Sequence, residues 1–317
     1  MPETLPEKKP WAQSMLATSI VGIVLCCMAF WFGLLFVCLI PLQWVYYKTG
    51  PRPALLIGVL VMVLMAGGQL IACWIQFGNI QAMVILEIVI VCAMVIGLAL
   101  LQNRAKPLPA WTRIILCYGV IVLCLAIMWL LLSFQTGMLA KLDQEMSGMM
   151  AAIGFKFDTG DTKNLWLELT LISLPIGLLV MVLINWYAAT WFWRRRSVQW
   201  SANSALANFR IAEYMVWPLL FSLAGIGLGL VMELPLLLQA ALSWVCLGVG
   251  FIYFLQGLGI LAAAIERRRN PHGRALSLPL VCAILFTLPV INVVAAVAIT
   301  LLGVLELWVR MRPATHA

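Results

Sequence analysis

The sequence predicts an all-α membrane protein, a polytopic bundle of eight to ten transmembrane helices, some of them short or re-entrant. Hydrophobic residues make up 64% of the 317 positions and charged residues only 10%, which is too few to cover the surface of a soluble protein. Apolar runs long enough for a spanning helix of about 20 residues recur along the chain. Most of the 20 Lys and Arg residues stand in short clusters between these runs.

The first half of the chain divides into apolar runs separated by turn-forming or basic residues. Residues 11–47 are too long for one span and short for two ideal ones, and they predict two closely joined helices, near 11–29 and 31–47, with Pro41 and the turn at 48–53 closing the run. The turn at 48–53 contains two prolines and a glycine, which end the second helix. Three further spans are expected in this half, at 55–76, 80–101 and 111–134.

The second half continues the same pattern of apolar runs and basic ends. The apolar run 165–193 ends at three consecutive arginines, 194–196. Two apolar runs then predict a helical hairpin, at 217–231 and 236–264. The final run, 275–309, again exceeds one span, and Pro289 divides it into two short or re-entrant segments.

The basic clusters also predict the topology. Lys and Arg are enriched in cytoplasmic loops of membrane proteins, and alternation along the chain then places both termini in the cytoplasm. The connection 135–164 carries four acidic residues and few basic ones, so we expect an extracytoplasmic loop there. Residues 194–216 are expected to form a cytoplasmic amphipathic segment. The whole chain, 1–317, is expected to be a single integral membrane domain.

Charge and composition also limit the classes of function. The net charge of +8 does not indicate a nucleic-acid-binding protein, because the basic residues flank apolar runs and form no single patch. They indicate contact with the lipid bilayer and its anionic headgroups. His272 and His316 lie in basic or terminal segments, and none of the nine cysteines forms a CxxC pair. We therefore expect no enzyme activity, no cofactor and no metal site.

Four polar side chains within the apolar runs are the candidate ligand-binding residues: Gln69, Glu87, Asn185 and Gln256. A carboxylate in hydrocarbon is costly unless it is paired or faces water, so Glu87 is expected to point into the bundle. Such residues either line a ligand cavity or form hydrogen bonds between helices, and the sequence leaves both roles open. Gly257, next to Gln256, would let another backbone or a ligand approach closely.

The cytoplasmic segment holds the candidate docking residues Trp200, Leu206 and Phe209. These apolar side chains stand among Ser, Asn and Arg residues. That composition is typical of a helix lying at the membrane interface, or of a surface that binds a membrane or cytoplasmic protein partner. Near the end of the chain, Glu306 and Arg310 are four residues apart, a spacing that allows an ion pair on one helix face.

Four stretches carry a resemblance to a known family: Pro41–Gly50, Phe209–Pro218, Phe254–Gly259 and Gly303–Arg312. Together they resemble the YybS-like bacterial integral membrane proteins, whose fold is similar to that of the S components of energy-coupling-factor transporters. The resemblance implies a location in the bacterial cytoplasmic (inner) membrane. S components dock on their partner through small residues four apart on early helices, whereas Ala12 and Ala17 are five apart here.

Two functional hypotheses follow from these observations. The resemblance and the polar residues within the spans favour a multi-pass inner-membrane protein that binds a small solute, in the manner of an S component, for transport. The alternative is a non-transporting scaffold or assembly factor of a membrane complex, which would use the cytoplasmic amphipathic segment. A closed polar cavity around Glu87 would favour the first hypothesis, and a tightly packed interior would favour the second.

Overall fold

The described residues form helices joined by turns, with no strand among them. This computed structural model describes residues 11–34, 37–78, 81–102, 108–134, 144, 148, 172–188, 209–229, 231–232, 234–267, 289–309 and 311–312. The predicted all-α helix bundle is therefore confirmed. Most of the predicted extracytoplasmic loop, 135–164, and most of the segment 194–216 lie outside the described residues.

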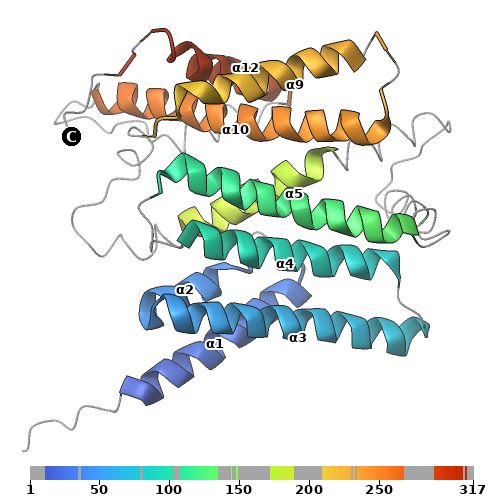
Figure 1. Ribbon diagram of the computed structural model, residues 1–317. Helices are drawn as coiled ribbons and strands as arrows, with labels where there is room; N and C mark the ends of the chain where they lie inside the picture. The colour runs from blue at the N-terminus through green and yellow to red at the C-terminus, as the bar shows by residue number, and fades with distance from the viewer. Residues whose placement is uncertain are drawn as a thin grey trace, which may run out of the picture. The chain divides into compact units, whose positions relative to one another are not determined.

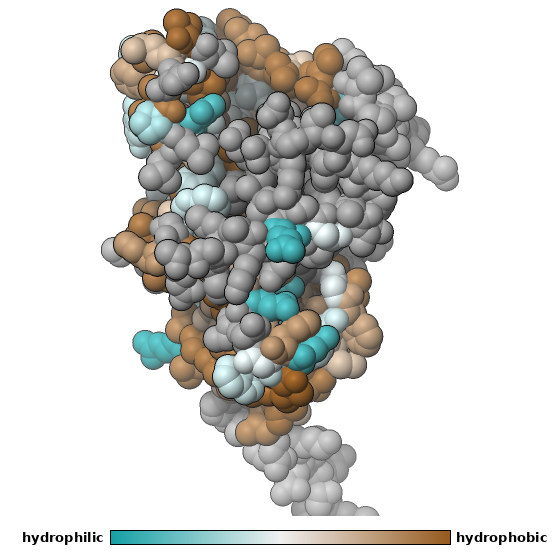
Figure 2. Space-filling view, turned by 90° about the vertical axis from the view of Figure 1, so that its right-hand side faces the viewer, coloured by the Kyte–Doolittle hydropathy of each residue, from teal (hydrophilic) through white to brown (hydrophobic). Residues whose placement is uncertain are grey.

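Four of the described helices are long and apolar enough to cross a membrane: Pro51–Phe77, Ala82–Gln102, Ala110–Leu132 and Leu238–Ile265. Shorter apolar helices accompany them, at Met15–Trp31, Ile172–Ala188, Glu213–Gly229 and Asn292–Leu305. Many large hydrophobic side chains on these helices are exposed, and Figure 2 shows such side chains over most of the coloured surface. A soluble monomer rarely exposes apolar surface on this scale, whereas a bilayer covers it with lipid. The chain is therefore a membrane protein.

The chain groups into two compact units, 1–107 with 116–196, and 108–115 with 197–317. The N-terminal unit begins with α1 (Trp11–Trp31), α2 (Ile40–Thr49), α3 (Pro51–Phe77) and α4 (Ala82–Gln102). In this unit α2 packs against α1 and α3, and α3 packs against α4, as Figure 1 shows. Most of α5 (Ala110–Phe134) and the helix Ile172–Ala188 belong to the same unit. The single domain expected from the sequence stays a prediction.

The helices α1 and α2 confirm that the first apolar run contains two helices, but the second one begins later than predicted. It was expected at 31–47 and lies at Ile40–Thr49. The chain leaves the first helix at Gly33, whose φ of 70° is a conformation that favours glycine. Pro41 then lies in the first turn of α2, where a residue without an N–H is well tolerated. The proline thus starts the second helix, whereas it was expected to close the apolar run.

The C-terminal unit contains η1 (Glu213–Met215), α9 (Val216–Gly229), α10 (Leu236–Arg267) and α12 (Pro289–Leu305). The long helix α10 packs against both α9 and α12 (Figure 1). The expected hairpin of 217–231 and 236–264 is therefore confirmed. Of the final run, α12 begins at Pro289, the residue predicted to interrupt it, and residues 275–288 lie outside the described part of the chain.

Two glycines allow α10 and α12 to cross with their backbones in contact. A Cβ atom added to Gly257 would overlap the carbonyl oxygen of Ile299 and lie 2.9 Å from its carbonyl carbon. A Cβ atom added to Gly303 would overlap the carbonyl oxygen of Tyr253 and lie 3.0 Å from the nitrogen of Gly257. Small residues at such crossings are a common device of membrane helices. The close backbone approach predicted at Gly257 is thus confirmed, and the approaching group is α12.

Candidate functional site

The four polar residues predicted to bind a ligand fall in different units. Gln69, Glu87 and Asn185 belong to the N-terminal unit, and Gln256 belongs to the C-terminal unit. No hydrogen bond between described residues joins any two of the first three. Each is therefore described in its own surroundings.

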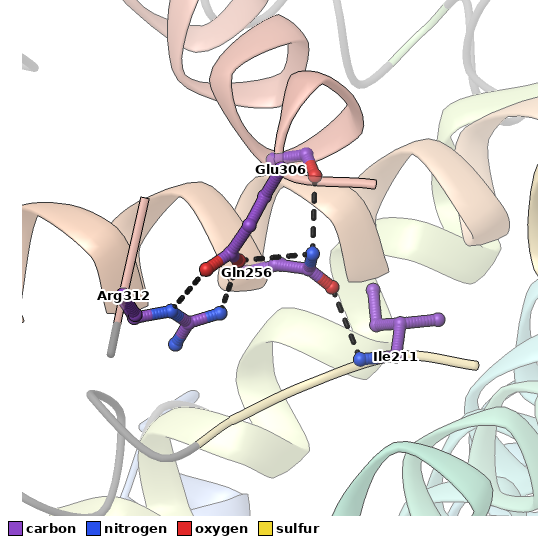
Figure 3. A network of polar contacts seen from close by, with 5 residues as sticks. Ile211, Gln256, Glu306 and Arg312 are labelled. Atoms are coloured by element: carbon purple, nitrogen blue, oxygen red, sulfur yellow. Dashed lines mark hydrogen bonds and ion pairs between the residues drawn. The ribbon is translucent and has the colours of Figure 1, made fainter. Parts of the chain in front are cut away.

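Gln256 connects three segments of the C-terminal unit. Its amide nitrogen Nε2 donates hydrogen bonds to the carbonyl oxygen of Gly303 and to Oε2 of Glu306, both at 3.1 Å. Its Oε1 accepts a hydrogen bond from the backbone N–H of Ile211 at 3.0 Å. Figure 3 shows these contacts around the buried amide. Of the two roles that the sequence left open, this geometry is that of a hydrogen-bonding residue between helices.

The Glu306 carboxylate in this network also pairs with Arg312. Nε of Arg312 donates to Oε1 of Glu306 at 2.6 Å, and Nη2 of the same guanidinium contacts Oε2. Both side chains are buried, since that of Arg312 is only 4% exposed and that of Glu306 only 8%. This is a two-point arginine–carboxylate pair, the strong form of this interaction. Arg310, the partner predicted from spacing, lies outside the described residues, so that pairing stays a prediction.

Asn185 links the helix Ile172–Ala188 to the start of α2. Its Oδ1 accepts a hydrogen bond from the backbone N–H of Leu39 at 3.1 Å, and its Nδ2 donates to the carbonyl oxygen of Met181 at 2.8 Å. Leu39 is the N-cap residue of α2, and no side chain of its own caps that helix. The first N–H groups of a helix lack intrahelical partners. Asn185 therefore supplies from a distant segment the acceptor for the N-cap N–H, the part that the N3 side chain plays in a capping box.

Gln69 and Glu87 are partly exposed on α3 and α4. Neither side chain has a hydrogen-bond or ion-pair partner among the described residues. Neither lines the cavity found in the same unit. Their role in ligand binding stays a prediction.

The three candidate docking residues are described only in part. Trp200 and Leu206 lie outside the described residues, whereas Phe209 is buried within the C-terminal unit. Its side chain therefore contributes to the interior of that unit. The docking role of the three residues stays a prediction.

A cavity of about 440 Å³ lies in the N-terminal unit between α2, α3 and α4. Its volume falls within the roughly 300–1,000 Å³ that is usual for small-molecule sites. Most of its walls are apolar, formed by side chains such as Leu42, Leu55, Val59 and Met62. Leu55 and Val59 are also exposed. The cavity therefore opens on a surface that faces lipid in a membrane.

One end of this cavity is polar, because Tyr46, Arg52 and Gln102 line it. The Tyr46 hydroxyl donates to the backbone carbonyl oxygen of Gln102 at 2.9 Å, which joins α2 to α4. The side-chain Nε2 of Gln102 is buried and has no hydrogen-bond partner within the described structure. Arg52 is exposed and has no ion-pair partner there either. The cation at this end is thus available to a ligand, whereas the Gln102 amide nitrogen is shielded.

This polar end was missed in the sequence, where Arg52 served only as a marker of topology. One feature of the sequence could have indicated it: Arg52 lies in the first turn of a long apolar helix, and that turn contains no acidic residue. Gln102 gave no signal, because a glutamine at the end of a span is common beside basic loops. Only the packing of the three helices brings the two residues to one cavity.

Gln43 is a further buried polar residue, on α2, and it is fully shielded at 0% exposure. Neither its Oε1 nor its Nε2 has a hydrogen-bond partner among the described residues. A buried polar group without a partner costs about 1–3 kcal/mol. Gln43 therefore makes the N-terminal unit less stable than an apolar side chain of the same size would.

Comparison of the chain with protein-family models, with curated proteins and with solved structures gave no match. The resemblance to the YybS-like family therefore stays a prediction.

Proposed function

We propose that this chain is a multi-pass protein of the bacterial cytoplasmic membrane that binds a small amphipathic molecule between α2, α3 and α4. The observation that carries the proposal is the cavity of about 440 Å³ with apolar walls and one polar end. Such a combination is typical of ligand sites, where apolar walls supply contact and a few polar groups supply orientation. The binding role agrees with what the resemblance to the YybS-like family implies.

Binding without catalysis is the form of this proposal that the cavity supports. The described residues lining it include no carboxylate, histidine or cysteine. Tyr46, a lining residue of a type that can transfer a proton, donates its hydroxyl hydrogen to the Gln102 carbonyl oxygen. Arg52 is suited to holding a ligand in place.

The scaffold hypothesis has less support than binding. It would place Phe209 on a surface that contacts a partner, and this side chain is buried in the C-terminal unit. It also expected a tightly packed interior, whereas α2, α3 and α4 leave a cavity between them. The closed polar cavity around Glu87 that was expected for a binding protein is not present among the described residues either, because the walls are mostly apolar and Glu87 does not line them.

The proposal is tested by closing the cavity with a tryptophan. Leu55 lines the cavity and is 57% exposed, and its neighbour Leu56 is 69% exposed and does not line it. The full chain and the variants Leu55→Trp and Leu56→Trp are purified in a mild detergent, and mass spectrometry identifies the small molecules that each retains. We expect the wild type and Leu56→Trp to retain the same amphipathic molecule and Leu55→Trp to lose at least nine-tenths of it, on the order of 1.4 kcal/mol of binding free energy. Equal retention by both variants would contradict the proposal.

A further inference from the structure

The cavity follows one face of α3 inward from its charged end. Arg52, Leu55, Val59 and Met62 all line it, and their spacing of three or four residues places them on the same side of a helix. Ten positions separate Arg52 from Met62, which corresponds to about 15 Å of helix. The hydrocarbon core of a bilayer is about 30 Å thick. The lined length of α3 therefore matches the depth of one leaflet.

The charged end of the cavity is suited to an anion. Arg52 has no ion-pair partner among the described residues. It lies in the first turn of α3, a helix whose N-cap makes no side-chain hydrogen bond and whose first turn contains no acidic residue. The N-terminus of a helix carries a partial positive charge.

We infer that this cavity holds one anionic phospholipid of the leaflet in which α3 begins. Its phosphate binds Arg52, and one acyl chain lies against Leu55, Val59 and Met62. This inference rests on the proposed function and names the class of its ligand. A soluble anion would use the charged end alone and leave the apolar walls uncovered. A zwitterionic lipid would bring its own cation to the same end of the cavity and leave the charge of the Arg52 guanidinium uncompensated overall.

The inference is tested by lipid selectivity. Native mass spectrometry counts the lipids bound to the detergent-purified full chain after addition of phosphatidylglycerol or phosphatidylcholine with identical acyl chains. We expect the wild type to prefer phosphatidylglycerol about fivefold, the effect of one arginine near a membrane surface. Arg52→Gln is expected to bring this ratio close to one. Because Arg52 is exposed and unpaired, the variant is expected to fold as the wild type does.

Lys48→Gln is the matched control, because Lys48 is a nearby exposed cation that does not line the cavity. We expect it to keep the preference of the wild type. An equal loss of preference in both variants would mean that the general surface charge attracts the lipid, and would overturn the inference. A preference that survives in Arg52→Gln would overturn it as well.

A third arm separates the lipid from a soluble anion. Glycerol phosphate, which has the headgroup chemistry without the acyl chains, is added in excess to the protein loaded with phosphatidylglycerol. We expect no displacement, and displacement would reassign the site to a soluble phosphate compound. Loss of lipid in Leu55→Trp together with an unchanged ratio in Arg52→Gln would leave the proposed binding function in place and overturn only the assignment of the headgroup.

Discussion

The crossing of α10 and α12 and the packing of α2, α3 and α4 are two different solutions to helix association in a membrane. At the crossing, Gly257 and Gly303 bring two backbones into contact. In the N-terminal unit, the three helices leave a cavity of about 440 Å³ between them. The first arrangement excludes any ligand, whereas the second provides room for one.

The two regions also differ in whether their buried polar groups have hydrogen-bond partners. At the crossing, Gln256, Glu306 and Arg312 bond to one another and to the backbone, and the Tyr253 hydroxyl is an unpartnered exception. In the N-terminal unit, the amides of Gln43 and Gln102 contain buried atoms without partners. Hydrogen bonds that are made stabilise a fold, whereas buried polar atoms without partners lower its stability. We therefore expect the crossing to be the more stable of the two regions.

The largest expected effect on stability comes from removing one arginine in each region. Arg312→Ala leaves the buried carboxylate of Glu306 without its partner, and we expect the free energy of unfolding to fall by about 3–5 kcal/mol. Arg52→Ala, at the open cavity, is expected to change it by less than about 0.5 kcal/mol. Denaturation of the purified variants in a detergent series measures both values. Similar losses for the two arginines would remove the distinction between the regions.

A smaller effect tests the contact of the two backbones. Gly303→Ala forces α12 away from Tyr253, and we expect a loss of about 1–3 kcal/mol in the free energy of unfolding. Gly250→Ala on α10 is the control, because a Cβ atom there has no neighbour within 4 Å. We expect that control to gain up to about 1 kcal/mol from helix propensity. An unchanged free energy of unfolding in Gly303→Ala would contradict the close contact of the two backbones at the crossing.

The smallest expected effect has the opposite sign. Gln43→Met replaces an unpartnered amide by an apolar side chain of similar size, and we expect a gain of about 1 kcal/mol in stability. The same change at Gln256 removes three hydrogen bonds and is expected to lower stability by about 2 kcal/mol or more. Thermal unfolding of the two variants side by side gives the comparison. A destabilised Gln43→Met protein would show that this amide has a partner in the membrane.

The positions of the long helices were predictable from the sequence because hydropathy is a local property. The span expected at 80–101, for example, is α4 at Ala82–Gln102. The contact at the start of α2 was not predictable, because the N–H of its N-cap residue Leu39 bonds to Asn185, which lies 146 residues away. Sequence patterns also proposed Gln256 as a ligand residue, and only the approach of Gly303 shows where its amide bonds. The cavity follows from the shapes of side chains on three helices, which no single segment encodes.

The hydrogen bond between Leu39 and Asn185 has a consequence for the order of events during synthesis. The helices α1 to α5 are made before the helix Ile172–Ala188 exists. Until then the Leu39 N–H has no Asn185 to bind, and a bare backbone N–H is costly in lipid. The ribosome must therefore add 146 residues before α2 acquires its acceptor. The contact at the N-cap of α2 can therefore form only after a later helix of the same unit has been made.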